Sequence, residues 1–485
     1  MEFATDVRTG KKLEAMIRKA GSLERRECFD DVKEYLYSPI VWKVFILYGL
    51  QDAGSRTLMK QVIASMTEEE MAVTAYIRID EKTYFWDIRH DMYQLEKAGF
   101  RYIFIEGIAF DSDFIRQASL FSDIFASSGM KIFFSGPLSL SFSLAERDQL
   151  YDSTITYHTT FITFREASAA LGFTCIDEFI RLGGTAKKAT FSSAKKTTQY
   201  IECAVADNIE ISLDYYEFAD EFRFLRDMHD KFNLFYSVYL IVENLNDSLV
   251  LEVLTSPSCS GDPIAAEVAE EIRTYIENDR KVMDEFGITE KTGKIIRDCL
   301  DELDLTFNIE VRALPYERKG ERTVISQPGM RYAQAKNLVK ETLRRKTFSH
   351  LSTEEKHSLT DRIMVRIEER IEEDVVLLET KLAYPKRQKN TVILHYSESG
   401  YNMVVYDKKD ISCDAYRICR SNTVESSLHS SLTDDRISKE TEHLYGPIMS
   451  RNVIYRGESV TADGIRYINV EEYLRALPAI NRFTY

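Results

Sequence analysis

Short apolar runs in the first half of the chain alternate with segments in which apolar residues recur every three to four positions. The short runs predict buried strands, and the longer repeats predict helices that pack against them. Strands are expected at residues 43–48, 72–79, 102–105, 130–134 and 155–161. Strands separated by helices of this size form βαβ units, so an α/β fold with a mostly parallel sheet is expected.

The pattern changes after Gly183-Gly184-Thr185, where a Ser/Thr/Ala-rich stretch carries several lysines, Lys187 among them. Mainly helical periodicity follows to about residue 290, then small helices and a hairpin expected to turn at Lys319-Gly320. A long helix and a second set of short strands close the chain. Four regions are therefore expected: a helical extension at 1–34, a nucleotide-binding sheet at 35–190, a helical and winged-helix-like middle at 191–350, and an α/β unit at 351–485.

Charge and cysteine usage exclude several classes of protein. The chain has 485 residues, with 63 Lys plus Arg against 78 Asp plus Glu, a net charge of −15. Such a chain is not expected to hold nucleic acid by bulk charge. The 7 cysteines include no CxxC pair, which favours a reducing compartment. Residues 1–30 lack an apolar signal core, and no apolar run is long enough to span a bilayer. A cytoplasmic protein is expected.

A candidate phosphate loop follows the first predicted strand. Gly49 and Gly54 have the spacing of the glycines in GxxxxGK[ST], and a helical pattern follows. Such a loop wraps backbone N–H groups around phosphates and needs a lysine and a hydroxyl. Ser55 and Arg56 occupy those two positions, and Thr57 lies one residue further along. Arg56 with Thr57 as a shifted pair, or a turn with no ligand, are the alternatives.

An ATPase of this type also needs an apolar strand that ends in Asp-Glu, for the metal and the attacking water. Residues 102–105 supply the strand, but Glu106 and Gly107 follow it. Glu106 retains a carboxylate for a metal, whereas Gly107 has no side chain that can act as a base.

Together these segments resemble a family of bacterial AAA-type P-loop ATPases with a C-terminal winged-helix and restriction-endonuclease-like region. The resemblance runs from about Pro39 to Leu477 and implies ATP and Mg²⁺ as ligands. The segments that carry it are Ile46–Thr57, Tyr102–Phe110, Asp113–Gly136, Leu150–Glu166, Gly183–Thr185, Ser326–Ala335, Glu373–Lys381, Tyr445–Gly457 and Gly464–Leu474.

The departures from the family pattern fall on the catalytic elements. Besides the loop and Glu106-Gly107, the polar sensor after the fourth strand is missing near Pro137-Leu138, which leaves Ser139 as the nearest hydroxyl. The resemblance implies an arginine that contacts the γ-phosphate, and Ser153 occupies its position in this chain. The resemblance thus implies a retained fold whose hydrolysis is weakened or lost.

The C-terminal region departs in the same way. Restriction-type nucleases hold Mg²⁺ with a helix Glu, a strand Asp and a Glu-x-Lys pair. Glu373 matches the first, but Asn402, Arg417 and Cys419 stand at the other positions. Because Mg²⁺ prefers charged oxygen ligands, nuclease activity is not expected.

Two alternatives to an ATP-binding protein remain open. One is a non-catalytic scaffold that pairs with a protein partner or with copies of itself. The other is a nucleic-acid-binding protein that uses the winged-helix-like region, which the acidic charge does not favour. The acidic cluster around Glu372 is expected to be a solvated helix face, and His158 a hydrogen-bonded histidine of the sheet.

Overall fold

The computed structural model describes most of the chain. The described residues are 2–484 except 41, 81, 108–118, 137, 148–151, 160, 216–233, 257–262, 286–289, 315–317, 385–387, 397–402 and 481–482. Asn402 and the first residues of the Asp113–Gly136 segment lie outside them.

The N-terminal sheet confirms the predicted strands and their parallel arrangement. Its order is β1-β3-β4-β5-β2-β6-β15, and the five central strands are parallel. The short edge strands β1 and β15 run antiparallel to their neighbours. The strands are β1 Asp6–Arg8, β2 Val44–Tyr48, β3 Thr74–Arg78, β4 Tyr102–Glu106, β5 Lys131–Gly136, β6 Thr154–His158 and β15 Phe483–Thr484. The expected helical extension therefore also contributes an edge strand to this sheet.

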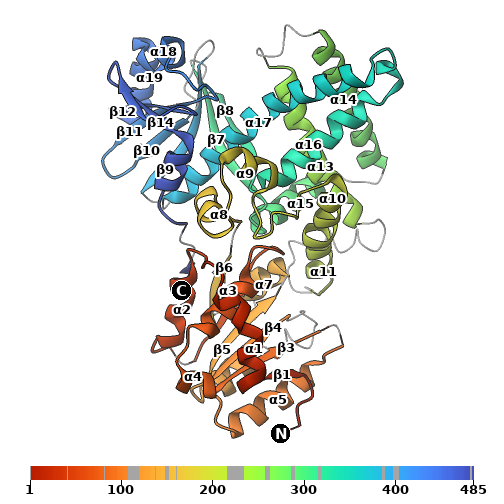
Figure 1. Ribbon diagram of the computed structural model, residues 1–485, viewed down its shortest axis with the longest axis vertical. Helices are drawn as coiled ribbons and strands as arrows, with labels where there is room; N and C mark the ends of the chain where they lie inside the picture. Colours follow the sequence, from red (N-terminus) through yellow and green to blue (C-terminus); the bar gives the residue numbers. More distant parts are fainter. Residues whose placement is uncertain are drawn as a thin grey trace.

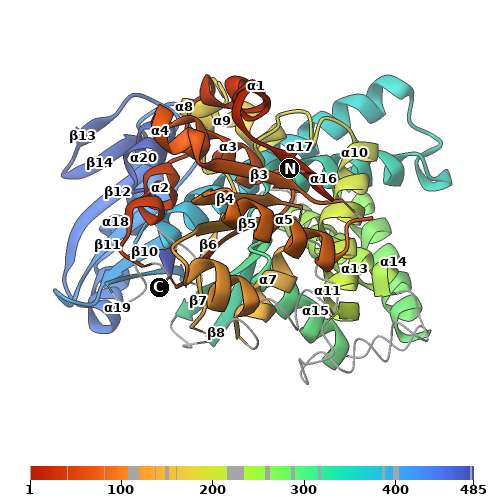
Figure 2. The same ribbon diagram turned by 90° about the horizontal axis from the view of Figure 1, so that it is seen from below.

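The chain leaves neighbouring strands β2 and β5 toward opposite faces of the sheet. Helices α1 and α3 cover one face, and α5 and α7 cover the other (Figure 2). These helices are α1 Gly10–Gly21, α3 Ser55–Ala64, α5 Phe85–Lys97 and α7 Ser139–Arg147. In open α/β sheets, ligands bind at the carboxyl ends of strands where the connections diverge in this way. A ligand site is therefore expected at the carboxyl ends of β2, β4 and β5.

The second sheet contains the predicted C-terminal strands and also the hairpin, in the order β13-β14-β12-β11-β10-β9-β7-β8. Its strands are β7 Thr306–Leu314, β8 Arg318–Ile325, β9 Lys389–Tyr396, β10 Met403–Asp407, β11 Ser412–Ile418, β12 Ile448–Tyr455, β13 Val460–Ala462 and β14 Ile465–Asn469. Because β7 pairs with β9, the expected boundary at residue 350 divides one sheet. The hairpin is a sheet edge and not a wing of the helical middle. Lys319 and Gly320 lie within β8 and not in its turn.

Three further helices pack on the N-terminal sheet: α2 Phe29–Tyr37, α4 Glu68–Ala72 and η1 Phe121–Ala126. The other helices lie with the second sheet or form the helical part at the upper right of Figure 1, and the long helix α17 runs between the two. They are α8 Phe164–Ala170, α9 Ile176–Leu182, α10 Ala194–Tyr200, η2 Ile201–Ala206, α11 Asp207–Tyr215, α13 Leu234–Leu254, α14 Pro263–Glu285, α15 Glu290–Glu302, α16 Pro328–Leu343, η4 Lys346–Phe348, α17 Thr353–Ala383, α18 Ser426–Thr433, α19 Asp435–Tyr445 and α20 Val470–Ala476.

The acidic cluster of α17 is not a solvated face, contrary to the prediction. The side chains of Glu368, Glu372 and Asp374 are buried. Arginines from distant segments pair with them: Arg420 lies 2.9 Å from Glu368, and Arg456 binds Glu372. Helical periodicity shows only that the acids share a face, and the arginines that cover this face come from elsewhere in the chain.

Helices α8 and α9 pack with the second sheet and the helices around it, which together form the upper body in Figure 1. They do so although they precede the expected boundary at residue 190. Phe164 and Phe179 share a hydrophobic core with α13, α16 and α17. The buried carboxyl of Glu379 on α17 accepts a 2.7 Å hydrogen bond from the Phe164 backbone N–H. Burial raises the pKa of Glu379 to about 8, and this hydrogen bond opposes the rise.

Within the residues that the structure describes, no helix combines the length and the apolar character that a bilayer span requires.

Replacing Glu379 with Gln should stabilise the protein in a pH-dependent way. A carboxyl whose pKa is raised to about 8 by folding contributes stability at low pH, and this contribution is lost as the pH rises through that value. The amide keeps an oxygen that accepts from Phe164 but never ionises. We expect the melting temperature of Glu379→Gln to exceed that of the native chain more at pH 8.5 than at pH 5. An equal difference at both values would contradict the burial argument.

Candidate functional site

The loop between β2 and α3 has the backbone that the sequence predicts for a phosphate loop. Gly54 is the N-cap of α3 with φ +87°, in the left-handed region that glycine adopts without strain. Gly54 has no side chain to cap the first N–H groups of α3, and an anion is favoured at such a helix N-terminus. Gly49 is required for close approach, because a Cβ there would lie 2.2 Å from the Thr159 carbonyl oxygen.

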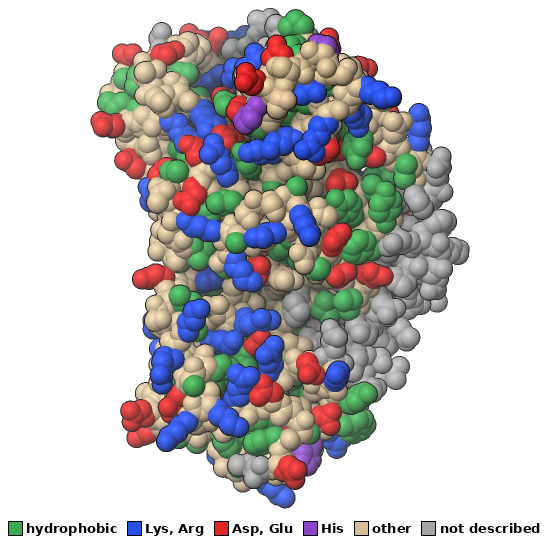
Figure 3. All heavy atoms as spheres, turned by 45° about the vertical axis from the view of Figure 1, so that its right-hand side comes forward, with side chains coloured by type: hydrophobic (Ala, Val, Ile, Leu, Met, Phe, Trp, Pro, Cys, Tyr) green, Lys and Arg blue, Asp and Glu red, His purple; other side chains and the backbone are tan. Residues whose placement is uncertain are grey.

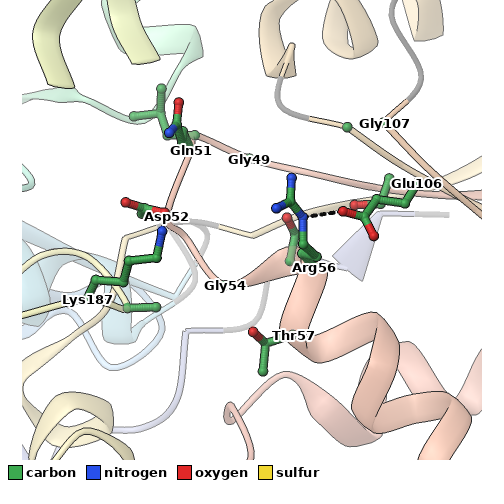
Figure 4. A pocket seen from close by; sticks show the side chains of 14 residues that line it. Gly49, Gln51, Asp52, Gly54, Arg56, Thr57, Glu106, Gly107 and Lys187 are labelled. Atoms are coloured by element: carbon green, nitrogen blue, oxygen red, sulfur yellow. Dashed lines mark hydrogen bonds and ion pairs between the residues drawn. The ribbon is translucent and has the colours of Figure 1, made fainter. Parts of the chain in front are cut away.

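A cavity of about 360 Å³ opens beside this loop at the carboxyl ends of β2, β4 and β5. The structure brings the seven residues predicted for the loop and the strand end together around it (Figure 4). They are Gly49, Gly54, Ser55, Arg56, Thr57, Glu106 and Gly107.

Cations of α3 contact both carboxylate oxygens of Glu106. Arg56 Nε pairs with Oε1, as the dashed line in Figure 4 marks, and Lys60 Nζ lies 3.8 Å from Oε2. The Glu106 side chain is 8% exposed, whereas that of Arg56 is 65% exposed. Burial lowers the pKa of Lys60, and Glu106 opposes this effect. Arg56 therefore reaches across the cavity mouth to the end of β4.

A second ion pair faces the first across the cavity. Lys187, from the loop after α9, pairs with Asp52 of the phosphate-loop candidate, and both line the cavity. The Ala186 N–H also donates to the Asp52 carbonyl at 2.8 Å. From the sequence, Lys187 was expected only in a linker, and no local motif connects it to Asp52, which lies 135 residues earlier in the chain.

The residues present do not fit a magnesium ion. Mg²⁺ prefers charged oxygen ligands, and the two carboxylates that line the cavity, Asp52 and Glu106, are each paired with a cation. Thr57 lies beyond Arg56 at the start of α3, and its side chain points away from Glu106 (Figure 4). Gly107 offers no side chain to a nucleophilic water. The cavity thus offers cations and backbone N–H donors to an anion. Its two carboxylates are not available as metal ligands, because each is paired with a cation.

Two other predicted positions lie away from the cavity. The Ser153 carbonyl accepts a 3.0 Å hydrogen bond from the N–H of Val44, at the opposite end of β2. Ser139 is buried, and its hydroxyl accepts from the Asn208 amide at 3.2 Å. Pro137 lies outside the described residues.

Ser135 at the end of β5 lines the cavity, although the sequence did not single it out as a candidate. His158 lies in β6, where its Nδ1 is 3.4 Å from Oδ2 of Asp304 and its ring stacks on Tyr48.

Three of the positions compared with a nuclease lie together in a second cavity of about 600 Å³, between α17 and the end of β11. They are Glu373, Arg417 and Cys419. Arg322 lies 3.1 Å from the Glu373 carboxylate and neutralises it. Burial raises the pKa of the Cys419 thiol. Among the described residues, no group of three or more His, Cys, Asp or Glu is arranged to hold a metal ion.

Comparison with known proteins adds no argument beyond this geometry. No family model and no curated protein matches the chain. Among solved structures, the S. cerevisiae Hsp104:casein complex in its extended conformation matches with 13% identity and a TM-score of 0.26. The match covers 42% of this chain and 38% of that chain. A likeness this low carries no weight for fold or function.

Gly107→Ala should destabilise the protein and thereby show that a side chain is not tolerated after Glu106. Gly107 has φ +88°, and a Cβ there would lie 2.6 Å from the Ile79 carbonyl oxygen. We expect a loss of about 2 kcal/mol in the free energy of unfolding, measured by urea denaturation. Gly320→Ala is the matched control, since that position is open and its change should stay within about 0.5 kcal/mol. Equal effects at the two glycines would refute the strain argument.

Proposed function

We propose that this chain is an AAA-type P-loop protein that binds the phosphates of ATP at the Gly49–Thr57 loop without hydrolysing the nucleotide. The observation that carries the proposal is the cavity between the N-terminus of α3 and the ends of β4 and β5. Its volume of about 360 Å³ suits a phosphate chain, with the rest of the nucleotide outside it.

The strand order supports this reading. Strand β5 lies between β2 and β4, so the loop after β2 and the carboxylate after β4 reach the same cavity from strands that are not neighbours. The outward N–H groups of α3 favour an anion there, and Arg56 and Lys187 add cations on two sides.

The same residues argue against turnover. Phosphoryl transfer to water needs a positioned base and charge stabilisation on the transferring group. Gly107 stands where the base is needed, and the Glu106 carboxylate is paired with Arg56 and Lys60. The protein is therefore proposed to hold ATP and release no phosphate.

ATP at millimolar concentration should raise the melting temperature of the native chain, since a ligand that binds only the folded state stabilises it. Arg56→Ala should reduce this shift by removing a cation at the cavity mouth. Arg344→Ala is the control, because Arg344 is similarly exposed and paired with Glu341 on α16, away from the cavity. Phosphate release should stay at background for all three proteins. A native chain without a thermal shift would refute ATP binding.

A non-catalytic scaffold is the second candidate, favoured by the ion pairs that already satisfy Asp52 and Glu106 inside the cavity. The variant Ser55→Lys plus Arg56→Thr, which restores the loop pattern, separates the two functions. If it gains an ATP-dependent shift that the native chain lacks, the native site is vestigial, and a protein partner or a second copy of the chain becomes the proposed ligand. If both proteins shift, the native loop binds ATP.

A further inference from the structure

Four cations surround the single carboxylate at the end of β4. Arg56 and Lys60 lie one turn apart on α3 and contact the two oxygens of Glu106. Arg78 ends β3 in register with Glu106, on the neighbouring parallel strand. Arg8 follows on β1, the next strand outward. Of these four, Arg56 lines the cavity itself, and the other three act on Glu106 or on Lys60 from neighbouring positions.

Lys60 is influenced by the charges of the other three cations and of Glu106. Burial lowers the pKa of Lys60, Glu106 opposes the shift, and Arg56, Arg78 and Arg8 lower the pKa further. The ion pair with Asp6, at 2.6 Å, raises the pKa of Arg8, and Glu106 adds to this rise. Asp80 in turn interacts with Arg78. Among the described residues, the four cations therefore face three carboxylates, which leaves an excess of one positive charge.

A local excess of cations is compatible with a chain that is acidic as a whole. Figure 3 shows many Lys and Arg side chains, with Asp and Glu among them, on the lower part of the molecule, where the N-terminal sheet lies. A local field of this kind attracts anions more strongly the more charges they carry.

We propose that the cluster of Arg8, Arg56, Lys60 and Arg78 replaces Mg²⁺, so that the site binds the metal-free form of a nucleoside triphosphate. This inference rests on the proposed ATP binding and specifies the ionic form of the ligand. In a metal-dependent site, a carboxylate at the strand end holds the ion that neutralises the phosphates. Here Glu106 holds the cations in place until the phosphates take them over.

The charge of the ligand determines the preference. ATP complexed with Mg²⁺ carries two fewer negative charges than free ATP, and it brings a cation toward side chains that are already cationic. Guanidinium groups present several N–H donors to phosphate oxygens and need no bridging metal. Glu106 competes with the phosphates for Arg56 and Lys60, so it weakens binding in this site, whereas it would strengthen binding in a magnesium site.

Isothermal titration calorimetry of ATP into the full native chain, once with EDTA and once with excess Mg²⁺, tests the inference directly. We expect the Kd in EDTA to be lower by about tenfold at low ionic strength, which corresponds to about 1.4 kcal/mol. Tighter binding with Mg²⁺ would overturn the inference and leave ATP binding intact. Absence of binding in both buffers would refute the proposed function itself.

Charge variants measured in EDTA provide the second test. Glu106→Gln should lower the Kd for ATP, because Arg56 and Lys60 lose their competing partner; a higher Kd would overturn the inference. Arg78→Gln should raise the Kd about threefold, by loss of one cation at the cluster. Lys97→Gln is the matched control, because Lys97 ends α5 shortly before the start of β4, whereas Glu106 lies at the other end of that strand. An equal effect of the two charge removals would overturn the inference, because only the total charge would then matter.

Discussion

The ion pairs of Glu106 determine what the N-terminal sheet can do. The carboxylate is buried at the end of a central strand, where it requires compensation of its charge. Arg56 and Lys60 supply it from the first turns of α3. The loop between β2 and α3 keeps its glycine-framed backbone, while the carboxylate at the end of β4 is paired with side-chain cations.

The loop is supported by segments far from it in the chain. Arg26, which precedes α2, forms a buried pair with Glu166 on α8 and binds the Ala53 carbonyl of the loop. The Tyr200 hydroxyl donates to the Gln51 carbonyl at 3.1 Å and accepts from Gln327 at 2.7 Å. Two backbone carbonyls of the loop, those of Gln51 and Ala53, therefore accept hydrogen bonds from side chains outside it.

The sequence predicted the strands and the loop well, because these depend on local patterns. A run such as residues 44–48 is buried on both faces of a parallel sheet, and it reads as a continuous apolar segment. The spacing of Gly49 and Gly54 and the carboxylate at Glu106 were equally visible. The acidic residues of α17 were misread because burial depends on what covers a helix face, and Arg420 and Arg456 come from strand ends that no periodicity connects to it.

The sequence by itself determined the order of strands and helices, the glycine frame of the loop and the loss of the side chain at Gly107. Only the tertiary structure decided that Arg56 turns to Glu106, that Lys187 joins the cavity, and that the hairpin 306–325 extends the second sheet. The physical reason is that charge pairing and sheet edges are satisfied between distant segments. A pattern along the chain records which groups need a partner, but the fold selects the partner.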